Sequence, residues 1–480
     1  MTATIGKTTC PYCGVGCGVN LTIPNSSTES VPPVSGDLDH PANFGRLCVK
    51  GSSLAQTLQS DDRLLTPIVK GESVSWESAV GTVSDKIAQV VQDHGPDAFA
   101  FYLSGQILTE DYYVANKLAK GFIGTANVDT NSRLCMASAV VGYKRAFGSD
   151  TVPCNYEDLE LCDLLILVGS NAAWTHPILY QRMAAAKKQR PNMKIVVIDP
   201  RETATCDIAD LHLAIKPGSD AAIFSFLLQH SAQTGILDND FIAQHTNGFN
   251  DALKQANEST PNLVSAAKFS GVSEQALMRL AHWWEQTEKT VTFYSQGVNQ
   301  SSSGVDKCNA IINCHLATGR IGKEGTGPFS ITGQPNAMGG REVGGLANQL
   351  AAHMDFATPG AQDLVQRFWQ APNLATENGL KAVDLFQAME EGKVKVVWIM
   401  STNPMVSLPD TAQVRRALEK CELVIVSDCK AHTDTTAFAD VLLPATGWSE
   451  KDGTVTNSER RISRQRGLLP APGDAKHDWW

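Results

Sequence analysis

Residues 8–19 read TTCPYCGVGCGV, and residues 45–51 read GRLCVKG. The two stretches hold four cysteines in the pattern C-x2-C-x3-C, then 30 residues, then a fourth: Cys10, Cys13, Cys17 and Cys48. Thiolates from one tight loop can take three corners of a cubane iron–sulfur cluster, and a distant cysteine can take the fourth. The glycines between them let the backbone pass close to the cluster and leave N–H groups for its sulfurs. We therefore predict an iron–sulfur cluster within residues 1–50.

Zinc is the alternative occupant of this cysteine group, because four thiolates also suit tetrahedral zinc. Structural zinc sites usually pair their cysteines two and two, whereas here three cysteines stand within eight residues. Burial of free cysteines in a core is a third interpretation, but the flanking residues are Gly, Pro and Tyr rather than aliphatic. The spacing favours the cluster and leaves zinc open.

The bulk composition indicates a soluble globular protein of about three domains. The chain has 480 residues, of which 42% are hydrophobic and 19% charged. A chain of this length can bury a large core without a structural metal, so a metal site is expected to be functional. The formal net charge is −10, and no dense basic run is present, which argues against a nucleic-acid partner.

Targeting signals are not evident in the sequence. No apolar run approaches the roughly 20 residues of a membrane span, and the first residues, MTATIGKTTC, lack the pattern of a signal peptide. We therefore predict no membrane association and a cytoplasmic protein, where its cysteines stay reduced.

Beyond residue 60, short apolar strands alternate with amphipathic helices. This alternation predicts an α/β fold with parallel sheets, whose strand ends bind ligands. The predicted strands are 164–168, 194–199, 291–294, 394–400 and 423–428. The predicted helices are 74–93, 178–189, 220–234, 274–288, 305–318 and 411–420.

The two cysteine stretches resemble the start of the molybdenum–bis(molybdopterin guanine dinucleotide) oxidoreductases, the dimethyl sulfoxide reductase and formate dehydrogenase superfamily. The resemblance extends over essentially the whole chain. It implies three cofactors, namely a [4Fe–4S] cluster, molybdenum and bis-molybdopterin guanine dinucleotide. It also implies that Lys50 lies between cluster and pterin on the electron path, although a lysine alone is usually a solvated surface residue.

The resemblance further implies a domain plan. Residues 1–60 would form a small [4Fe–4S] domain to which 448–476 return. Residues 61–135 with 336–447, and residues 136–335, would form two doubly wound parallel-sheet domains that bind the pterins. We expect that the C-terminal pterin-capping β-barrel domain of the superfamily is absent and that the chain is truncated.

Cys135 lies in NSRLCMAS, residues 131–138. A lone cysteine before a helix of small residues usually packs in a core. The resemblance instead implies that Cys135 binds molybdenum, and a soft thiolate suits a redox metal. This motif is closest to assimilatory and periplasmic nitrate reductases. Formate dehydrogenases place His after the ligand, where this chain has Met136, which would line the substrate pocket.

A second active-site segment is SITGQPNAMGGREVGG, residues 330–345, which holds five glycines. Such a segment indicates backbone forced close to something bulky. By resemblance to nitrate reductases, Gln334 and Arg341 belong to the active site and Arg341 faces the molybdenum. Its guanidinium would bind a planar oxyanion such as nitrate. A surface ion pair with Glu342 is the alternative.

Polar residues at strand ends form the predicted pterin cradle. Gly169, Ser170 and Asn171 offer N–H groups to a pyrophosphate. The resemblance adds further cofactor-binding residues near the guanosines and the pterin: Asp199, Arg201, Gly218, Asp220, Asn299, Gln300, Ser401, Asn403 and Asp428. The remaining seven cysteines match no ligand spacing and are predicted core residues.

The predicted function is the molybdenum-dependent reduction of nitrate to nitrite. Electrons would enter through the cluster from ferredoxin, flavodoxin or an NADH-linked reductase subunit. Two alternatives remain open: a formate dehydrogenase on the same fold, and an inactive or partial fragment that acts only as an iron–sulfur protein.

Overall fold

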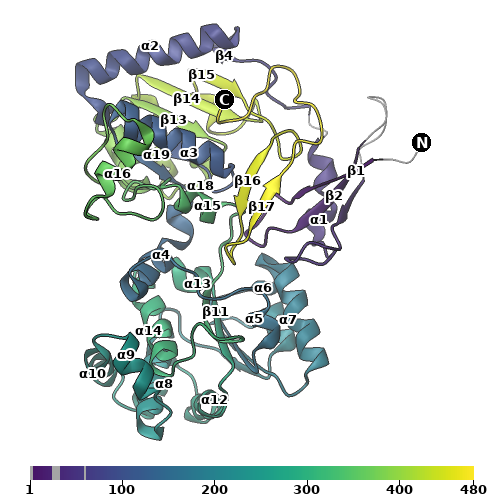
Figure 1. Ribbon diagram of the computed structural model, residues 1–480, viewed down its shortest axis with the longest axis vertical. Coiled ribbons are helices and arrows are strands. Elements are labelled where there is room, and N and C mark those ends of the chain that lie inside the picture. Colours follow the sequence, from purple (N-terminus) through teal and green to yellow (C-terminus); the bar gives the residue numbers. More distant parts are fainter. Residues whose placement is uncertain (1–3, 24–32, 59–60) are drawn as a thin grey trace. The chain divides into compact units, whose positions relative to one another are not determined.

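A computed structural model describes residues 4–23, 33–58 and 61–480 (Figure 1). The chain divides into two units, which are described separately. The first unit comprises Met1–Leu134, Gln334–Asn457 and Arg461–Trp480, and the second comprises Cys135–Gly333 and Ser458–Arg460. The chain therefore passes from one unit to the other directly before Cys135 and directly before Gln334. The finer domain boundaries inside the first unit stay a prediction.

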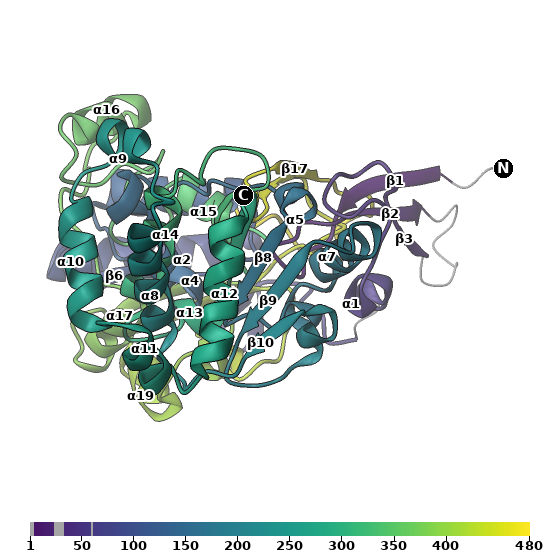
Figure 2. The same ribbon diagram turned by 90° about the horizontal axis from the view of Figure 1, so that it is seen from below.

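The second unit is built on a five-stranded parallel sheet. Its strands, in spatial order, are β10 (Leu211–Leu213), β9 (Lys194–Ile198), β8 (Leu164–Val168), β11 (Thr290–Tyr294) and β12 (Gly327–Ser330). Every residue of β8 and β11 is buried, as expected for a parallel sheet covered by helices on both faces. In Figure 2, helices α7 (Pro177–Gln189) and α12 (Glu274–Gln286) flank these strands on either side.

The first unit contains a seven-stranded sheet. Its spatial order is β5 (Glu72–Ser73), β4 (Ile68–Val69), β15 (Val441–Pro444), β14 (Leu423–Asp428), β13 (Val396–Met400), β6 (Phe99–Leu103) and β7 (Val128–Thr130). The strands from β15 to β7 are parallel, and β4 and β5 form an antiparallel edge.

A small antiparallel sheet near the N-terminus also belongs to the first unit. It consists of β1 (Thr4–Thr9), β2 (Gly18–Ile23) and β3 (Val34–Gly36). The hairpin of β16 (Gly453–Thr456) and β17 (Ile462–Gln465) lies beside it (Figure 1). Thr9 Oγ1 donates to Gln465 Oε1 at 2.6 Å, and Gln465 Nε2 donates to Thr8 Oγ1 at 3.0 Å. Distant parts of the chain thus meet in this small domain.

The remaining α-helices of the described residues are α1 (Val49–Ser52), α2 (Trp76–His94), α3 (Thr109–Lys117), α4 (Arg133–Phe147), α5 (Asp158–Leu161), α6 (Ala172–Thr175), α8 (Asp220–Thr234), α9 (Asn239–His245), α10 (Phe249–Ser259), α11 (Leu263–Ser270), α13 (Gln296–Asn299), α14 (Gly304–Ala317), α15 (Ala337–Glu342), α16 (Ala361–Trp369), α17 (Ala382–Glu390), α18 (Pro404–Ser407) and α19 (Thr411–Lys420). A π-helical turn, η3, spans Leu118–Ile123. Within the described part of the chain, no helix has both the length and the apolar character needed to cross a bilayer.

The predicted α/β class with parallel sheets is confirmed. Strands β8 and β14 and helices α8 and α19 have the predicted bounds. Helix α2 begins at Trp76, two residues later than predicted, because the side chain of Ser75 accepts a hydrogen bond from Ser78 N at 3.2 Å and caps the helix.

Candidate functional site

The four predicted cluster ligands lie together. Cys10 directly follows β1 and Cys17 directly precedes β2, so the turn of this hairpin carries three of the cysteines. Cys10 N donates to Cys17 O at 2.8 Å and closes the loop. Cys48 precedes α1 and lies close enough to influence the pKa of each of the other three thiols.

The environment of these thiols fits a metal cluster. Burial raises the pKa of Cys10 to about 12 and of Cys13 to about 11, although backbone N–H groups of Tyr12 and Val15 act in the opposite direction. Burial also raises the pKa of Cys17. Bare thiolates are therefore unfavourable here, and bound iron would supply the compensating charge.

The geometry of the four cysteines is compatible with a cluster of several irons. Among the described residues, no three His, Cys, Asp or Glu side chains converge closely enough to hold a single metal ion. Ligands of a cubane cluster bind four separate irons and need not converge on one point.

Lys50 lies beside the cysteine loop. Its side chain is exposed, and Nζ is 6.0 Å from the ring centroid of Tyr12. Its charge lowers the pKa values of Cys10 and Cys13, against the larger effect of burial. Lys50 is thus close to the cluster ligands, and its place on an electron path stays a prediction.

The strand order of the second unit reverses between β8 and β11. In open α/β sheets, ligands bind outside the carboxyl ends of the strands at such a switch point. Gly169, with φ of 53°, follows β8 there, and Gly297 N donates to Gly169 O at 2.9 Å. A Cβ on Gly169 would lie 2.8 Å from Gly297 Cα, so the two backbones approach too closely for a side chain.

Cys135 belongs to this switch point. It lies in the first turn of α4, and the side-chain amide of Gln296, two residues after β11, donates to its Sγ at 3.2 Å. Met136 follows with non-helical φ and ψ of −138° and 31°, and its side chain is buried. Gln296 is not among the residues predicted from the sequence, although its place two residues beyond a buried strand was a usable signal.

Ser170 carries a direct sign of a ligand. Its Oγ is buried and has no hydrogen-bond partner among the described residues. A buried hydroxyl without a partner costs about 1–3 kcal/mol. The predicted pyrophosphate would provide the acceptor that this hydroxyl lacks, so the cradle residue fits the implied cofactor.

Other predicted cradle residues of the second unit already have protein partners. Asp220 pairs with buried Lys307 at 2.7 Å, and Asp199 Oδ1 accepts from Arg201 N at 2.9 Å. Gly218 has φ of 90°, which favours glycine. Gln300 is exposed at the end of α13. These contacts are all made within the protein, so the cofactor-binding roles of these residues stay predictions.

The strand order of the first unit reverses between β6 and β13. Asn131 Oδ1 accepts from Gly105 N, directly beyond β6, at 2.9 Å. Asn131 Nδ2 donates to Thr402 Oγ1, beyond β13, at 3.0 Å. Gln334 Nε2 donates to the same Asn131 oxygen at 2.8 Å, and Gln334 Oε1 accepts from Ser132 at 2.5 Å. Gln334 therefore lies at the switch point of this sheet.

Arg341 lies on α15 and is only 3% exposed. This burial does not fit a residue at the protein surface, and the role of Arg341 in the active site stays a prediction. Its Nη2 contacts Met338 Sδ. The glycines around it accommodate Tyr112, because an added Cβ would lie 2.6 Å from the Tyr112 ring at Gly340 and 2.8 Å from it at Gly345. The bulky group that this segment approaches is thus a side chain of the protein.

The two sheets use the same arrangement at one strand end. Asn171 follows β8, and its Oδ1 accepts from Thr205 Oγ1 at 3.0 Å. Asn403 follows β13, and its Oδ1 accepts from Thr435 Oγ1 at 2.6 Å. Each threonine hydroxyl in turn accepts from a backbone N–H two residues beyond the asparagine. Predicted cradle residues Asn171 and Asn403 thus occupy equivalent places.

A cavity of about 450 Å³ in the first unit connects the cysteine loop with the strand ends. Cys10 and Tyr12 line it together with Ser401 and Asp428, both predicted cofactor-binding residues. Lys451 also lines it, and its buried ammonium lies 3.4 Å from Asp478 and 3.8 Å from Asp111. Its size and its mixture of polar and apolar lining residues suit part of a large cofactor.

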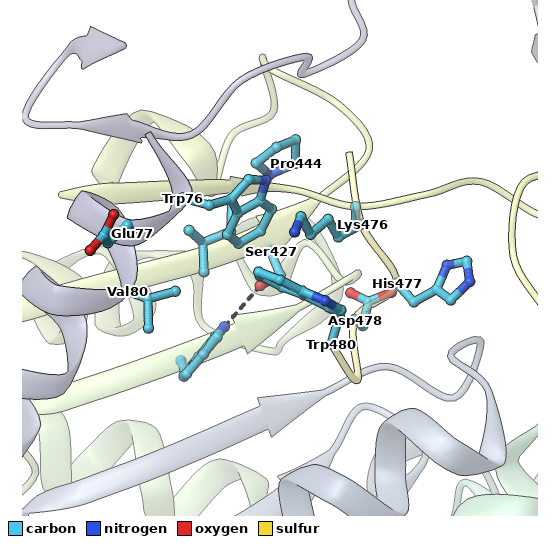
Figure 3. A pocket seen from close by; sticks show the side chains of 12 residues that line it. Trp76, Glu77, Val80, Ser427, Pro444, Lys476, His477, Asp478 and Trp480 are labelled. Atoms are coloured by element: carbon cyan, nitrogen blue, oxygen red, sulfur yellow. Dashed lines mark hydrogen bonds between the residues drawn. The ribbon is translucent and has the colours of Figure 1, made fainter. Parts of the chain in front are cut away.

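A second cavity of the first unit, of about 610 Å³, lies elsewhere (Figure 3). Trp76 and Trp480 meet edge to face there, with ring centroids 5.4 Å apart, and Lys476 lies next to both rings. None of the predicted site residues lines this cavity. It is not part of the candidate site.

The seven remaining cysteines are only partly in the core. Cys154, Cys162, Cys308 and Cys314 are buried as predicted. The prediction is wrong for Cys206, Cys421 and Cys429, which are partly exposed because they lie in connections outside the sheets' interiors.

Comparison with known proteins points to one family. Residues 63–480 match the molybdopterin oxidoreductase family, and residues 3–60 match the molybdopterin oxidoreductase Fe4S4 domain. A nitrate reductase of Klebsiella oxytoca is 56% identical over 99% of this chain and 54% of its own length. A nitrate reductase of Shewanella frigidimarina is 52% identical over 99% of this chain and 51% of its own length. The chain spans about half the length of these two relatives.

More distant relatives share the fold. The F420-dependent formate dehydrogenase 1 subunit alpha of Methanococcus maripaludis is 35% identical over 98% of this chain and 68% of its own length. The structure of acetylene hydratase from Pelobacter acetylenicus superimposes with a TM-score of 0.81 at 18% identity, covering 98% of this chain and 67% of that one.

Proposed function

Because the chain belongs to the molybdopterin oxidoreductase family, we propose that it catalyses the two-electron reduction of nitrate to nitrite. Family membership assigns it a [4Fe–4S] cluster, molybdenum and molybdopterin as cofactors. The observation that carries the proposal is the place of Cys135 at a sheet switch point, in a chain 56% identical to a nitrate reductase. The overall reaction consumes nitrate, two electrons and two protons, and yields nitrite and water.

The chemistry that bound molybdenum would supply is oxygen-atom transfer from nitrate. The Cys135 thiolate would be its protein ligand, and the pterins would be two guanine dinucleotides in the strand-end cradles. Arg341 would orient the nitrate, since a buried guanidinium offers charge-assisted hydrogen bonds to a planar oxyanion in a site of low dielectric. Gln334 is fixed by its bonds to Asn131 and Ser132 and would support the same pocket. By the family resemblance, Met136 would line the substrate pocket.

The cluster, held by the four cysteines, would supply electron transfer, and Lys50 beside the cysteine loop would lie on the electron path. The donor, whether ferredoxin, flavodoxin or an NADH-linked reductase subunit, stays a prediction, as does the cytoplasmic location. The acidic chain repels an anion overall, so the local charge of Arg341 would carry nitrate binding.

Formate dehydrogenase is the competing function, supported by relatives that are 35% identical. Met136 stands where formate dehydrogenases typically carry His, and this difference favours nitrate. The two candidates are separated by assaying purified protein with nitrate and reduced viologen, and with formate and an oxidising dye.

The decisive experiment combines metal analysis of anaerobically purified protein with the variant Cys135→Ser. We expect molybdenum and iron in the wild type and loss of nitrate turnover in the variant. Cys421→Ser is the matched control. Cys421 lies before the amino end of β14, whereas the predicted cofactor-binding residues lie at the carboxyl ends of the strands. Absence of molybdenum, or unchanged turnover in Cys135→Ser, would refute the proposal. A chain that binds iron but has no turnover would instead be the iron–sulfur fragment.

A further inference from the structure

We propose that Gln296 is a positioning residue that raises the reduction potential of the metal centre held by Cys135, through its side-chain hydrogen bond to the cysteine sulfur. The inference rests on the proposed ligation of molybdenum by Cys135. Gln296 Nε2 lies 3.2 Å from Cys135 Sγ, within the range of an N–H···S hydrogen bond.

The contact is fixed by the backbone on both sides. Gln296 opens the short helix α13, which Gly297 N ties to Gly169 O at 2.9 Å. The same turn is joined to α4, the helix of Cys135, through Asn299, whose Oδ1 accepts from Ala139 N at 2.8 Å. The carbonyl of Asn299 also accepts from Ser138 Oγ at 2.7 Å. These hydrogen bonds hold α13 and α4 in a fixed relative position. The Gln296 amide therefore lies within hydrogen-bond distance of the Cys135 sulfur.

The hydrogen bonds of Asn299 indicate a structural role for this residue, in place of the predicted contact with the cofactor. Its amide nitrogen donates to Ser295 O at 3.1 Å and to Ser330 Oγ at 3.2 Å. With its oxygen on Ala139 N, the buried side chain has protein partners for both ends. Asn299 thus braces the turn that carries Gln296, and the Gln296 amide is the group that donates to the sulfur.

Gly333 lies beside the hydrogen bond between Gln296 and Cys135. Gly333 has no side chain, and a Cβ there would lie 3.6 Å from Gln296 Nε2 and 3.8 Å from Cys135 Sγ. Neutral amide donors withdraw charge from a thiolate without adding a charge of their own. A thiolate that donates less electron density stabilises the reduced state of its metal, and hydrogen bonds to sulfur ligands shift reduction potentials in this way.

The test is a redox titration of the molybdenum EPR signal in the purified holoprotein. Gln296→Met keeps the length of the side chain and removes the donor. We expect about a tenfold higher oxidised-to-reduced ratio at a fixed potential, which corresponds to a midpoint lowered by about 59 mV for a one-electron couple. Gln296→Asn, which is one carbon shorter, is a second variant that takes the donor away from the sulfur. The control is Gln189→Met, an exposed position at the end of α7.

The outcomes separate this inference from the proposed function. A wild-type midpoint and EPR signal in both Gln296 variants would overturn the role of Gln296, even where Cys135→Ser shows that the cysteine binds molybdenum. An unchanged molybdenum signal in Cys135→Ser would overturn the proposed ligation itself. A lowered midpoint in both Gln296 variants and a wild-type midpoint in Gln189→Met would support the inference.

Discussion

The side-chain amide of Asn457 donates a hydrogen bond to the carbonyl oxygen of Val15, with 3.2 Å between nitrogen and oxygen, although 442 positions separate the two residues. Gly16 lies next to this bond with φ of 66°. A Cβ on Gly16 would lie 2.7 Å from the Cβ of Asn457. The cysteine loop is therefore shaped in part by a segment from the far end of the chain.

Gly16→Ala should weaken the cluster site. The substitution combines an unfavourable positive φ, which costs about 1–2 kcal/mol, with a clash against Asn457. We expect less iron per chain and a weaker cluster EPR signal after anaerobic purification. Gly81→Ala is the matched control, because Gly81 lies within α2, has ordinary helical φ and has open space where the Cβ would be. It should be neutral or stabilising by up to about 1 kcal/mol. Equal iron content in both variants would contradict the prediction.

Ser170→Ala should weaken cofactor retention without lowering the stability of the cofactor-free protein. The hydroxyl of Ser170 is buried without a partner in the part of the chain that the structure describes, so its removal should leave the cofactor-free protein as stable as the wild type or slightly more so. The holoprotein should lose a contact to the predicted pyrophosphate and release molybdopterin faster on dilution. Thermal unfolding of both forms and cofactor release measure the two effects. A cofactor-free protein that is clearly destabilised would show that the hydroxyl has another partner.

Lys120 holds the turn that follows Arg341. Its ammonium is fully buried and donates to the carbonyl oxygens of Gly344, Leu346 and Gln349 at 2.7, 2.8 and 2.7 Å. Three acceptors use all three N–H groups of the protonated form, whereas burial lowers the pKa of Lys120 to about 7. The residue lies on the π-helical turn η3, a feature common at functional sites.

The protonation of Lys120 predicts how stability depends on pH. An unfolded lysine keeps its proton up to about pH 10.4, while the folded one with its lowered pKa releases it near 7. The unfolded state therefore binds more protons between these values, so the folded state gains stability as pH rises through this window. The unfolding free energy of wild type minus that of Lys120→Met should rise by up to about 1.4 kcal/mol per pH unit. A flat difference would mean that the three carbonyls keep the ammonium charged.

Arg341→Lys should weaken nitrate binding. A lysine offers a point charge in place of the planar fork of arginine, so a bidentate contact with nitrate is lost. We expect the KM for nitrate to rise about tenfold, or about 1.4 kcal/mol, with molybdenum and iron contents unchanged. Arg279→Lys, at an exposed position of α12, is the control. An unchanged KM would place the nitrate elsewhere.

The sequence alone predicted the α/β class, the bounds of several long helices and strands, and the grouping of the four N-terminal cysteines. Buried parallel strands such as β8 and β14 are continuous apolar runs, which are recognisable without any tertiary contact. The four cysteines are recognisable for a similar reason, since three of them lie within one short loop whose spacing already restricts their geometry.

Tertiary structure decided which polar residues meet. The order of strands around β8 and β11 brings Gln296 to Cys135, and the order around β6 and β13 brings Asn131 to Gln334. The tertiary structure also places Asn299 between α13 and α4, buries Arg341, and packs Gly340 and Gly345 against Tyr112. The physical reason is that a hydrogen bond or a close packing contact depends on distances between segments more than a hundred residues apart, and local sequence patterns carry no information about those distances.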